Sequence, residues 1–242
     1  YAIRNIHNST SKEALKIALY RIVFEEFLIL QLGLFMFKNG TTEVEGIKFN
    51  RDENLDNILK ALPFKLTNAQ NRALNEIIED MQSNKVMNRL VQGDVGSGKT
   101  VVALLALANC VLNGYQGALM APTEILAEQH YISLSETLKP FGMEIELLVG
   151  SLTKKQKEKV LERVKNKEID ILIGTHALIE DKVEFNNLGI VITDEQHRFG
   201  VRQRSKLSEK GINPDILVMT ATPIPRTLAL ILYLLLMHVF LL

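Results

Sequence analysis

Six short apolar runs, which alternate with stretches of helical periodicity, place the strongest constraint on the fold of this chain of 242 residues. The runs occupy residues 89–92, 117–121, 145–149, 170–174, 188–193 and 215–220. Strands that are this short and continuously apolar are typical of a parallel sheet covered by helices on both faces. We therefore predict an α/β domain, in which ligands bind at the carboxyl ends of the strands.

The periodicity changes near residue 63, and this change suggests the domain boundaries. Residues 9–37 have the spacing of one long helix, and a polar connector and a short helix follow up to Leu62. Pro63 ends that short helix, and Thr67 with Gln70 then matches a capping box. We predict three segments, namely a helical linker, the α/β domain and an apolar tail, over residues 1–62, 63–233 and 234–242.

Composition limits the possible partners and the location. Lys and Arg total 28, as do Asp and Glu, so a nucleic acid would have to be bound by local patches rather than by the overall charge. Cys110 lies alone in an apolar run, which predicts a buried residue of a reduced, cytoplasmic protein. The apolar end, residues 228–242, is shorter than the roughly 20 residues that span a bilayer, so we expect no membrane partner. If left uncovered, however, residues 234–242 would form an exposed apolar patch.

Residues 93–100, GDVGSGKT, match the phosphate-loop pattern G-x-x-x-x-G-K-[ST]. A predicted strand precedes the match and a predicted helix follows it, as this motif requires. The glycines let backbone N–H groups point at phosphate oxygens, while Lys99 reaches the β- and γ-phosphates and Thr100 holds Mg²⁺. The predicted nucleotide-binding residues of the loop are Gly93, Asp94, Gly96, Ser97, Gly98, Lys99 and Thr100.

An acidic pair, Asp194-Glu195, directly follows the predicted strand 188–193. On its own such a pair would indicate an ordinary strand end with two solvated acids. Because it follows a phosphate loop and continues into Gln196-His197, it favours a nucleotide-hydrolysing site. We predict that Asp194 binds the metal and that Glu195 orients the attacking water, so the predicted catalytic residues are Lys99, Asp194 and Glu195.

Five blocks of sequence together resemble superfamily 2 helicases and, more closely, the RecG-type branch-migrating DNA helicases. They are QGDVGSGKTVVA (92–103), APTEILAEQH (121–130), GTHALI (174–179), DEQHRFGVRQR (194–204) and MTATPIPRTLAL (219–230). The resemblance implies a RecA-like lobe that binds and hydrolyses ATP with Mg²⁺. It also implies a DNA helicase that remodels branched double-stranded DNA and single-stranded DNA, at forks and Holliday junctions, in repair and recombination.

The same resemblance implies roles for further residues. Gln70 resembles a residue that reads the adenine edge, although a helix-capping role fits it equally well. The residues that resemble loops gripping the DNA backbone are Pro122, Thr123, Gly150, Ser151, Thr175 and His176. Pro122-Thr123 also fits a strand-to-helix turn with an N-cap threonine. The residues that resemble those coupling nucleotide state to DNA grip are Gln196, His197, Thr220 and Thr222.

The basic stretch 154–167 is a further candidate for a DNA site. Val160, Leu161 and Val164, however, give it an apolar face with helical spacing. We therefore predict an amphipathic helix whose charges form a solvated surface.

By resemblance, a wedge domain would precede residue 1, and a second RecA-like lobe with an arginine finger would follow near residue 234. We therefore expect a truncated chain that is inactive or weak alone, with a tail that resembles nothing in the family. Two alternatives remain open. One is the motor of a transcription-repair coupling translocase, whose pattern prefers Asp-Glu-Glu-His where this chain has Gln196. The other is a truncated nucleotide- and DNA-binding module without activity.

Overall fold

The computed structural model describes residues 1–40, 45–194, 206–221 and 237–241. The chain divides into two compact units, residues 1–42 with 225–235 and residues 43–224 with 236–242, and each is described by itself. The elements are α1 (Ala2–His7), α2 (Lys12–Gly40), α3 (Asn54–Ala61), α4 (Asn68–Met81), β1 (Asn88–Gly93), α5 (Lys99–Leu112), β2 (Gln116–Met120), α6 (Glu124–Leu138), η1 (Lys139–Phe141), β3 (Ile145–Leu148), α7 (Lys154–Lys165), β4 (Ile171–Gly174), η2 (His176–Ile179), β5 (Leu188–Asp194), β6 (Asp215–Thr220) and β7 (Met237–Leu241).

The first unit contains the predicted long helix, which is α2. It begins later than residue 9, because the hydroxyl of Ser11 accepts a hydrogen bond from the backbone N–H of Ala14 at 3.0 Å and so caps the first turn. The shorter helix α1 precedes it and contacts it, and Ala14 and Ala18 are buried.

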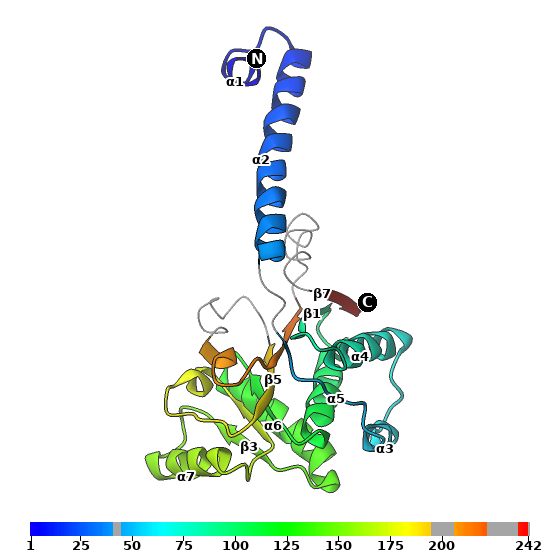
Figure 1. Cartoon of the computed structure of the whole chain (residues 1–242), viewed down its shortest axis with the longest axis vertical. Coiled ribbons are helices and arrows are strands. Elements are labelled where there is room, and N and C mark those ends of the chain that lie inside the picture. The colour runs from blue at the N-terminus through cyan, green and yellow to red at the C-terminus, as the bar shows by residue number, and fades with distance from the viewer. Residues whose placement is uncertain (41–44, 195–205, 222–236, 242) are drawn as a thin grey trace. The chain divides into compact units, whose positions relative to one another are not determined.

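The second unit contains one sheet of seven strands in the order β3-β4-β2-β5-β6-β1-β7, and every neighbouring pair is parallel (Figure 1). All six apolar runs of the sequence are strands, which confirms the predicted α/β fold. In a parallel sheet the carboxyl ends of the strands share one edge, so the last residues of β1, β5 and β6 lie at that edge although they are far apart in the chain.

Alternate residues of the strands enter two separate hydrophobic clusters. Ile190 and Ile192 of β5 lie in the cluster that includes residues of α3, α4, α5 and α6, whereas Val191 lies in the cluster that includes residues of α7 and η2. The sheet is therefore buried on both faces, as its apolar strands predict. The predicted amphipathic helix of the basic stretch is α7, which buries Val160 and Val164.

The boundary of this unit lies earlier than the predicted position at residue 63. Phe49, Leu55 and Ile58 are fully buried in the same cluster as α5. The side chain of Asn113, just after α5, also accepts from the backbone N–H of Asn50 and donates to its carbonyl, both at 2.8 Å. Residues 45–62 therefore belong to the core of the α/β unit, because the buried surface of α5 extends to them.

Part of the apolar tail forms a strand, which the sequence did not predict. Met237–Leu241 forms strand β7, which pairs in parallel with β1 in a register from Arg89 opposite Met237 to Gly93 opposite Leu241 (Figure 1). The pairing satisfies backbone groups on the side of β1 that faces away from β6, and an unpaired sheet edge readily accepts such a strand.

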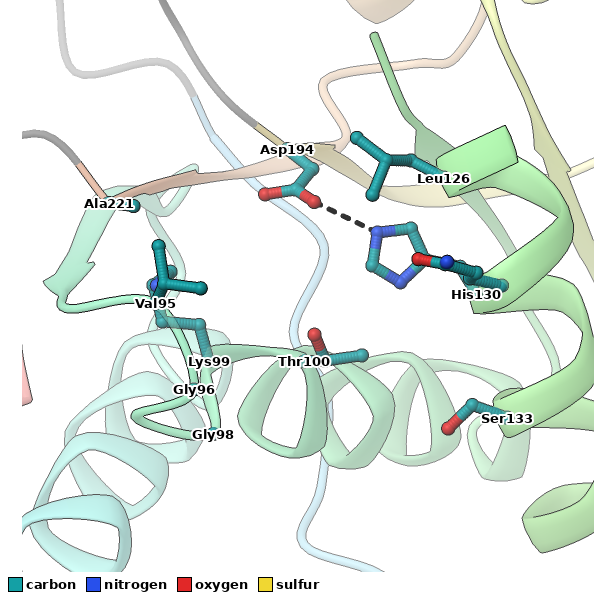
Figure 2. A pocket seen from close by; sticks show the side chains of 11 residues that line it. Val95, Gly96, Gly98, Lys99, Thr100, Leu126, His130, Ser133, Asp194 and Ala221 are labelled. Carbon is teal, nitrogen blue, oxygen red and sulfur yellow. Dashed lines mark hydrogen bonds and ion pairs between the residues drawn. The ribbon is translucent and has the colours of Figure 1, made fainter. Parts of the chain in front are cut away.

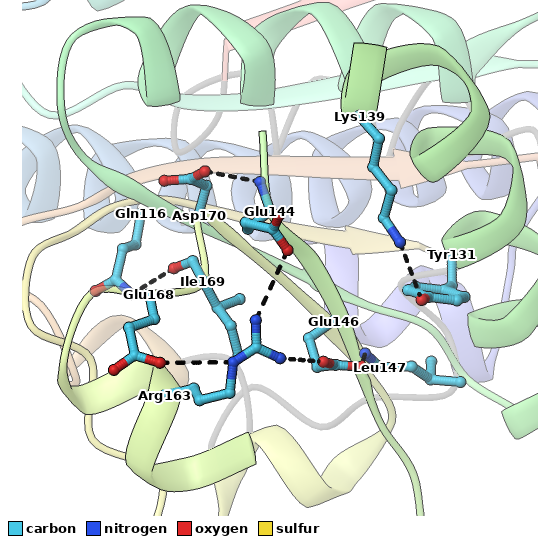
Figure 3. Close-up of polar contacts among 10 residues, drawn as sticks. All are labelled: Gln116, Tyr131, Lys139, Glu144, Glu146, Leu147, Arg163, Glu168, Ile169 and Asp170. Atoms are coloured by element: carbon cyan, nitrogen blue, oxygen red, sulfur yellow. Dashed lines mark hydrogen bonds and ion pairs between the residues drawn. The ribbon is translucent and has the colours of Figure 1, made fainter. Parts of the chain in front are cut away.

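Polar side chains connect α7 to residues at or just before the starts of β2, β3 and β4 (Figure 3). Gln116, at the start of β2, donates to the carbonyls of Val164 at 2.9 Å and Ile169 at 2.7 Å, and it accepts from the N–H groups of Asn186 and Asn187. Arg163 of α7 forms ion pairs with three carboxylates, those of Glu144, Glu146 and Glu168. Because Gln116 is 1% exposed, its four hydrogen bonds fix the connections around β2 and β4 in a dry environment.

Asp215, at the start of β6, is a fully buried acid. One carboxylate oxygen accepts from the N–H of Met87 at 2.7 Å, while the other has no hydrogen-bond partner among the described residues. Burial raises the pKa of Asp215 to about 7, against the opposing effect of the Met87 N–H.

This pKa predicts that the stability of the unit depends on pH. Between about pH 4 and pH 7 the unfolded chain releases the proton of Asp215 while the folded chain keeps it, so the free energy of unfolding falls as pH rises. Asp215→Asn removes this titration. We expect the free energy of unfolding of the variant, measured by urea denaturation, to rise relative to that of the native chain as the pH is raised. The change from about pH 5 to about pH 8 should be roughly 2 kcal/mol.

Glu79→Gln, which changes an exposed acid on α4, is the matched control and should leave the pH profile unchanged. Parallel pH profiles for Asp215→Asn and the native chain would contradict the account.

Candidate active site

The phosphate loop connects β1 to α5 and depends on two glycines with positive φ. Gly96 has φ 82° and Gly98 has φ 84°, in the left-handed region that other residues rarely adopt. A Cβ atom on Gly98 would also lie 2.2 Å from the side-chain nitrogen of Gln70. Position 98 therefore requires glycine for both its backbone conformation and its close neighbour.

Lys99 is the first residue of α5 and lies against the loop. Its ammonium group donates to the carbonyls of Gly93 and Asp94, both at 2.8 Å. The N-terminus of α5 adds the positive end of the helix dipole at the same place. The loop therefore offers a concentrated positive potential to a phosphate group.

Asp194, at the carboxyl end of β5, lies close to His130 of α6, with 2.9 Å between the carboxylate oxygen Oδ2 and the imidazole Nε2 (Figure 2). Both side chains line a cavity of about 420 Å³ together with the phosphate loop. The lining residues are Val95, Gly96, Gly98, Lys99, Thr100, Leu126, Gln129, His130, Ser133, Asp194 and Ala221. The structure thus brings Lys99, Thr100 and Asp194 to one site, as the motifs predict.

The residues of this cavity fit a magnesium nucleotide. Thr100 and Asp194 offer a hydroxyl and a carboxylate from opposite sides, and the buried hydroxyl of Ser97 has no hydrogen-bond partner among the described residues. Within the described ranges, no three His, Cys, Asp or Glu side chains are grouped as a metal cage. Mg²⁺ commonly binds through one or two protein groups plus phosphate oxygens and water, which suits this arrangement.

Gln70 connects α4 to the phosphate loop. Its side-chain oxygen accepts from the N–H of Thr67 at 2.9 Å, which completes the predicted capping box, and its nitrogen donates to the carbonyl of Ser97 at 2.8 Å. A second cavity, of about 490 Å³, includes Gln70, Gly98 and the half-exposed ring of Phe64. An aromatic ring beside a phosphate loop offers a surface on which a flat nucleotide base can stack.

The predicted DNA-gripping residues follow three adjacent strands, β2, β4 and β3. Thr123 caps α6, since its hydroxyl accepts from the N–H of Leu126 at 3.3 Å, and Pro122 precedes it. A Cβ atom on Gly150 would lie 2.6 Å from a carboxylate oxygen of Glu124, so the segments after β2 and β3 are in contact.

These predicted residues differ in exposure. Gly150, Ser151 and His176 are exposed, whereas Thr175 is 2% exposed. The structure therefore places the six residues at neighbouring strand ends, with Thr175 beneath the surface.

The remaining predicted residues divide into two groups. Thr220 is fully buried at the end of β6, opposite Gln92 of β1. The residues that lie outside the described ranges are Glu195, Gln196, His197 and Thr222.

The motifs alone did not assign roles to His130 or Phe64. The signal for His130 is a polar stripe on α6 with helical spacing, formed by Gln129, His130 and Ser133, which faces the phosphate loop. The signal for Phe64 is an aromatic residue six positions before Gln70, directly after the proline that ends α3.

Together the parallel sheet, the phosphate loop and the acid at the end of β5 define a phosphate-loop nucleotide-binding domain with a RecA-like fold. The DEAD/DEAH box helicase family matches residues 67–231, so the chain belongs to this family.

Within this family, the chain is similar in sequence to helicases named RecG. The chain is 55% identical to the ATP-dependent DNA helicase RecG of Bacillus subtilis over 231 residues, 95% of this chain and 34% of that protein. It is 55% identical to the RecG of Aquifex aeolicus over 88% of this chain and 27% of that protein. The chain therefore spans about a third of the length of these curated relatives.

Solved structures agree with this assignment. A structure of RecG bound to a three-way DNA junction aligns with a TM-score of 0.84 and 46% identity, over 99% of this chain and 32% of the other. A DEAD box protein from Methanococcus jannaschii, with a TM-score of 0.60 and 20% identity, shares the fold. Among the described residues, no helix is both long and apolar enough to span a membrane.

The position of Lys99 predicts a large effect on nucleotide affinity. Lys99→Ala removes the charge that would neutralise the β- and γ-phosphates while the glycines keep the shape of the loop. We expect affinity for a fluorescent ATP analogue to fall by about ten- to a hundredfold in an equilibrium titration.

Lys154→Ala is the matched control for this titration, because its lysine side chain is 92% exposed on α7. It should bind the analogue as the native chain does. Unchanged affinity in Lys99→Ala would refute the assignment of the phosphate loop.

Proposed function

We propose that this chain is the motor lobe of an ATP-dependent DNA helicase that remodels branched DNA, such as forks and Holliday junctions, in repair and recombination. The observation that carries the proposal is the division of one sheet edge into two halves. The ends of β5, β6 and β1 carry the residues that we assign to the nucleotide, and the ends of β3, β4 and β2 carry the loops that we assign to DNA. A motor needs this adjacency, since hydrolysis at one half must alter grip at the other.

On the nucleotide half, we propose ATP with Mg²⁺ as the ligand. The metal would neutralise phosphate charge and be held by Thr100 and Asp194. Lys99 would bind the β- and γ-phosphates, and the loop N–H groups would cradle them. Phe64 and Gln70, which line the second cavity, would contact the base. Glu195, next to Asp194 in the chain, would orient the attacking water and accept its proton.

On the DNA half, we propose that single-stranded DNA and branched double-stranded DNA are bound through their phosphates. The exposed residues Gly150, Ser151 and His176 suit such contacts, which position DNA without reading its sequence. Gln196, His197, Thr220 and Thr222 would transmit nucleotide state to these loops. The basic side chains of α7 remain a solvated surface in this proposal, because that helix buries its apolar face in the core.

We further propose that activity requires parts that the longer relatives possess. A second RecA-like lobe would supply arginines on the far side of the γ-phosphate, and an arginine finger is worth about 10³ to 10⁵ in rate in related hydrolases. A wedge domain would split the branched DNA. Alone, the chain should bind ATP weakly and show little DNA-stimulated hydrolysis. A cytoplasmic location stays a prediction from the composition.

A chimera tests the proposal, because it supplies those parts. Residues 45–233 would replace the matching segment of Bacillus subtilis RecG, to which the chain is 55% identical. The chimera should hydrolyse ATP faster with a forked DNA and should unwind it. Glu195→Gln in the chimera should keep ATP binding and lower hydrolysis by about 10²-fold or more, since glutamine cannot accept the proton.

Glu79→Gln, an exposed change on α4, is the control and should leave hydrolysis unchanged. A folded chimera that binds ATP but gains nothing from forked DNA would contradict the helicase function. Hydrolysis by Glu195→Gln within about a factor of two of the parent chimera would exclude Glu195 as the base.

A further inference from the structure

His130 is a buried polar residue of α6 that lies where the polar stripe of this helix meets its apolar, buried face. It is 7% exposed, and its neighbours at helical spacing on α6, Ala127 and Leu134, are fully buried. An imidazole costs more to bury than a leucine of similar size unless its polar atoms are bonded. A purely packing role would therefore be better served by an apolar side chain.

The imidazole is hydrogen-bonded to Asp194, an acid that lines the cavity beside the phosphate loop. Nε2 of His130 lies 2.9 Å from Oδ2 of Asp194, and both side chains are mostly buried. An ionised carboxylate can only accept, so Nε2–H donates to Oδ2. The second oxygen of Asp194 is directed away from His130 (Figure 2).

We propose that His130 is a positioning residue for the metal, which holds the carboxylate of Asp194 in one orientation with its second oxygen presented to Mg²⁺. The inference rests on the proposed function of the cavity. Carboxylates that bind metals are commonly held by such a hydrogen bond, and loss of the outer partner weakens metal binding by about 10- to 100-fold. Asp194 is the last residue of β5 and its backbone pairs with that of Met219, but strand pairing does not orient the carboxylate, which the hydrogen bond to His130 does.

The test measures Mg²⁺ dependence rather than hydrolysis. Binding of a fluorescent ATP analogue to the chain is titrated with Mg²⁺, and binding without Mg²⁺ is measured in parallel. For His130→Leu we expect the Mg²⁺ concentration at half-effect to rise about 10- to 100-fold. Affinity without Mg²⁺ should stay within about twofold of the native chain, because the phosphate loop is untouched.

Two polar variants separate the hydrogen bond from burial, even if His130→Leu fails to fold. The amide nitrogen of glutamine reaches the place of Nε2, whereas that of asparagine ends short of it. His130→Gln should therefore keep the native Mg²⁺ dependence, and His130→Asn should lose it. Glu128→Gln, an exposed change on the same helix, should behave as the native chain.

Each outcome decides the inference. Native Mg²⁺ dependence in both the leucine and asparagine variants overturns it, and so does a glutamine variant that behaves like asparagine. If the native chain binds the analogue without any Mg²⁺ effect, the proposed metal site fails and the inference fails with it. The behaviour of the native chain thus distinguishes failure of the proposed function from failure of His130.

Discussion

The parallel pairing of β5, β6 and β1 is the constraint on which the candidate site depends. Asp194 pairs with Met219, and Gln92 pairs with Thr220, so the three strands end at the same level. This register places an acid and a phosphate loop that are separated by about a hundred residues on the walls of one cavity. The fold therefore determines the distance between the groups that would bind phosphate and metal.

Helices on both sides of α5 then fix the side chains of the site. Gln70 of α4 bonds the loop at Ser97, and His130 of α6 bonds Asp194. Both helices share a hydrophobic cluster with α5, so these polar contacts are held by the same core that stabilises the sheet. A site built from packed helices and strand ends is preorganised, which phosphoryl transfer requires because it depends on position and charge.

Local patterns in the sequence predicted much of this arrangement. The six apolar runs and the capping box at Thr67 each depend on a few neighbouring residues, and the structure confirms them. The motif around Lys99 is equally local, and the structure places it between β1 and α5. Features that depend on contacts between residues far apart in the chain could not be predicted from these local patterns. Phe49 joins the core only because α5 lies beside it, β7 forms only because β1 offers its edge, and His130 gains its partner only through the sheet.

A crystal structure of the chain with a non-hydrolysable ATP analogue and Mn²⁺, located by its anomalous scattering, tests the account most directly. The account predicts the β- and γ-phosphates against Lys99 and the ion about 2 Å from the hydroxyl of Thr100. It predicts Asp194 beside the ion, in contact directly or through one water, with its other oxygen still bonded to His130. An ion bound away from Thr100 and Asp194, or an analogue bound outside the phosphate loop, would contradict the account.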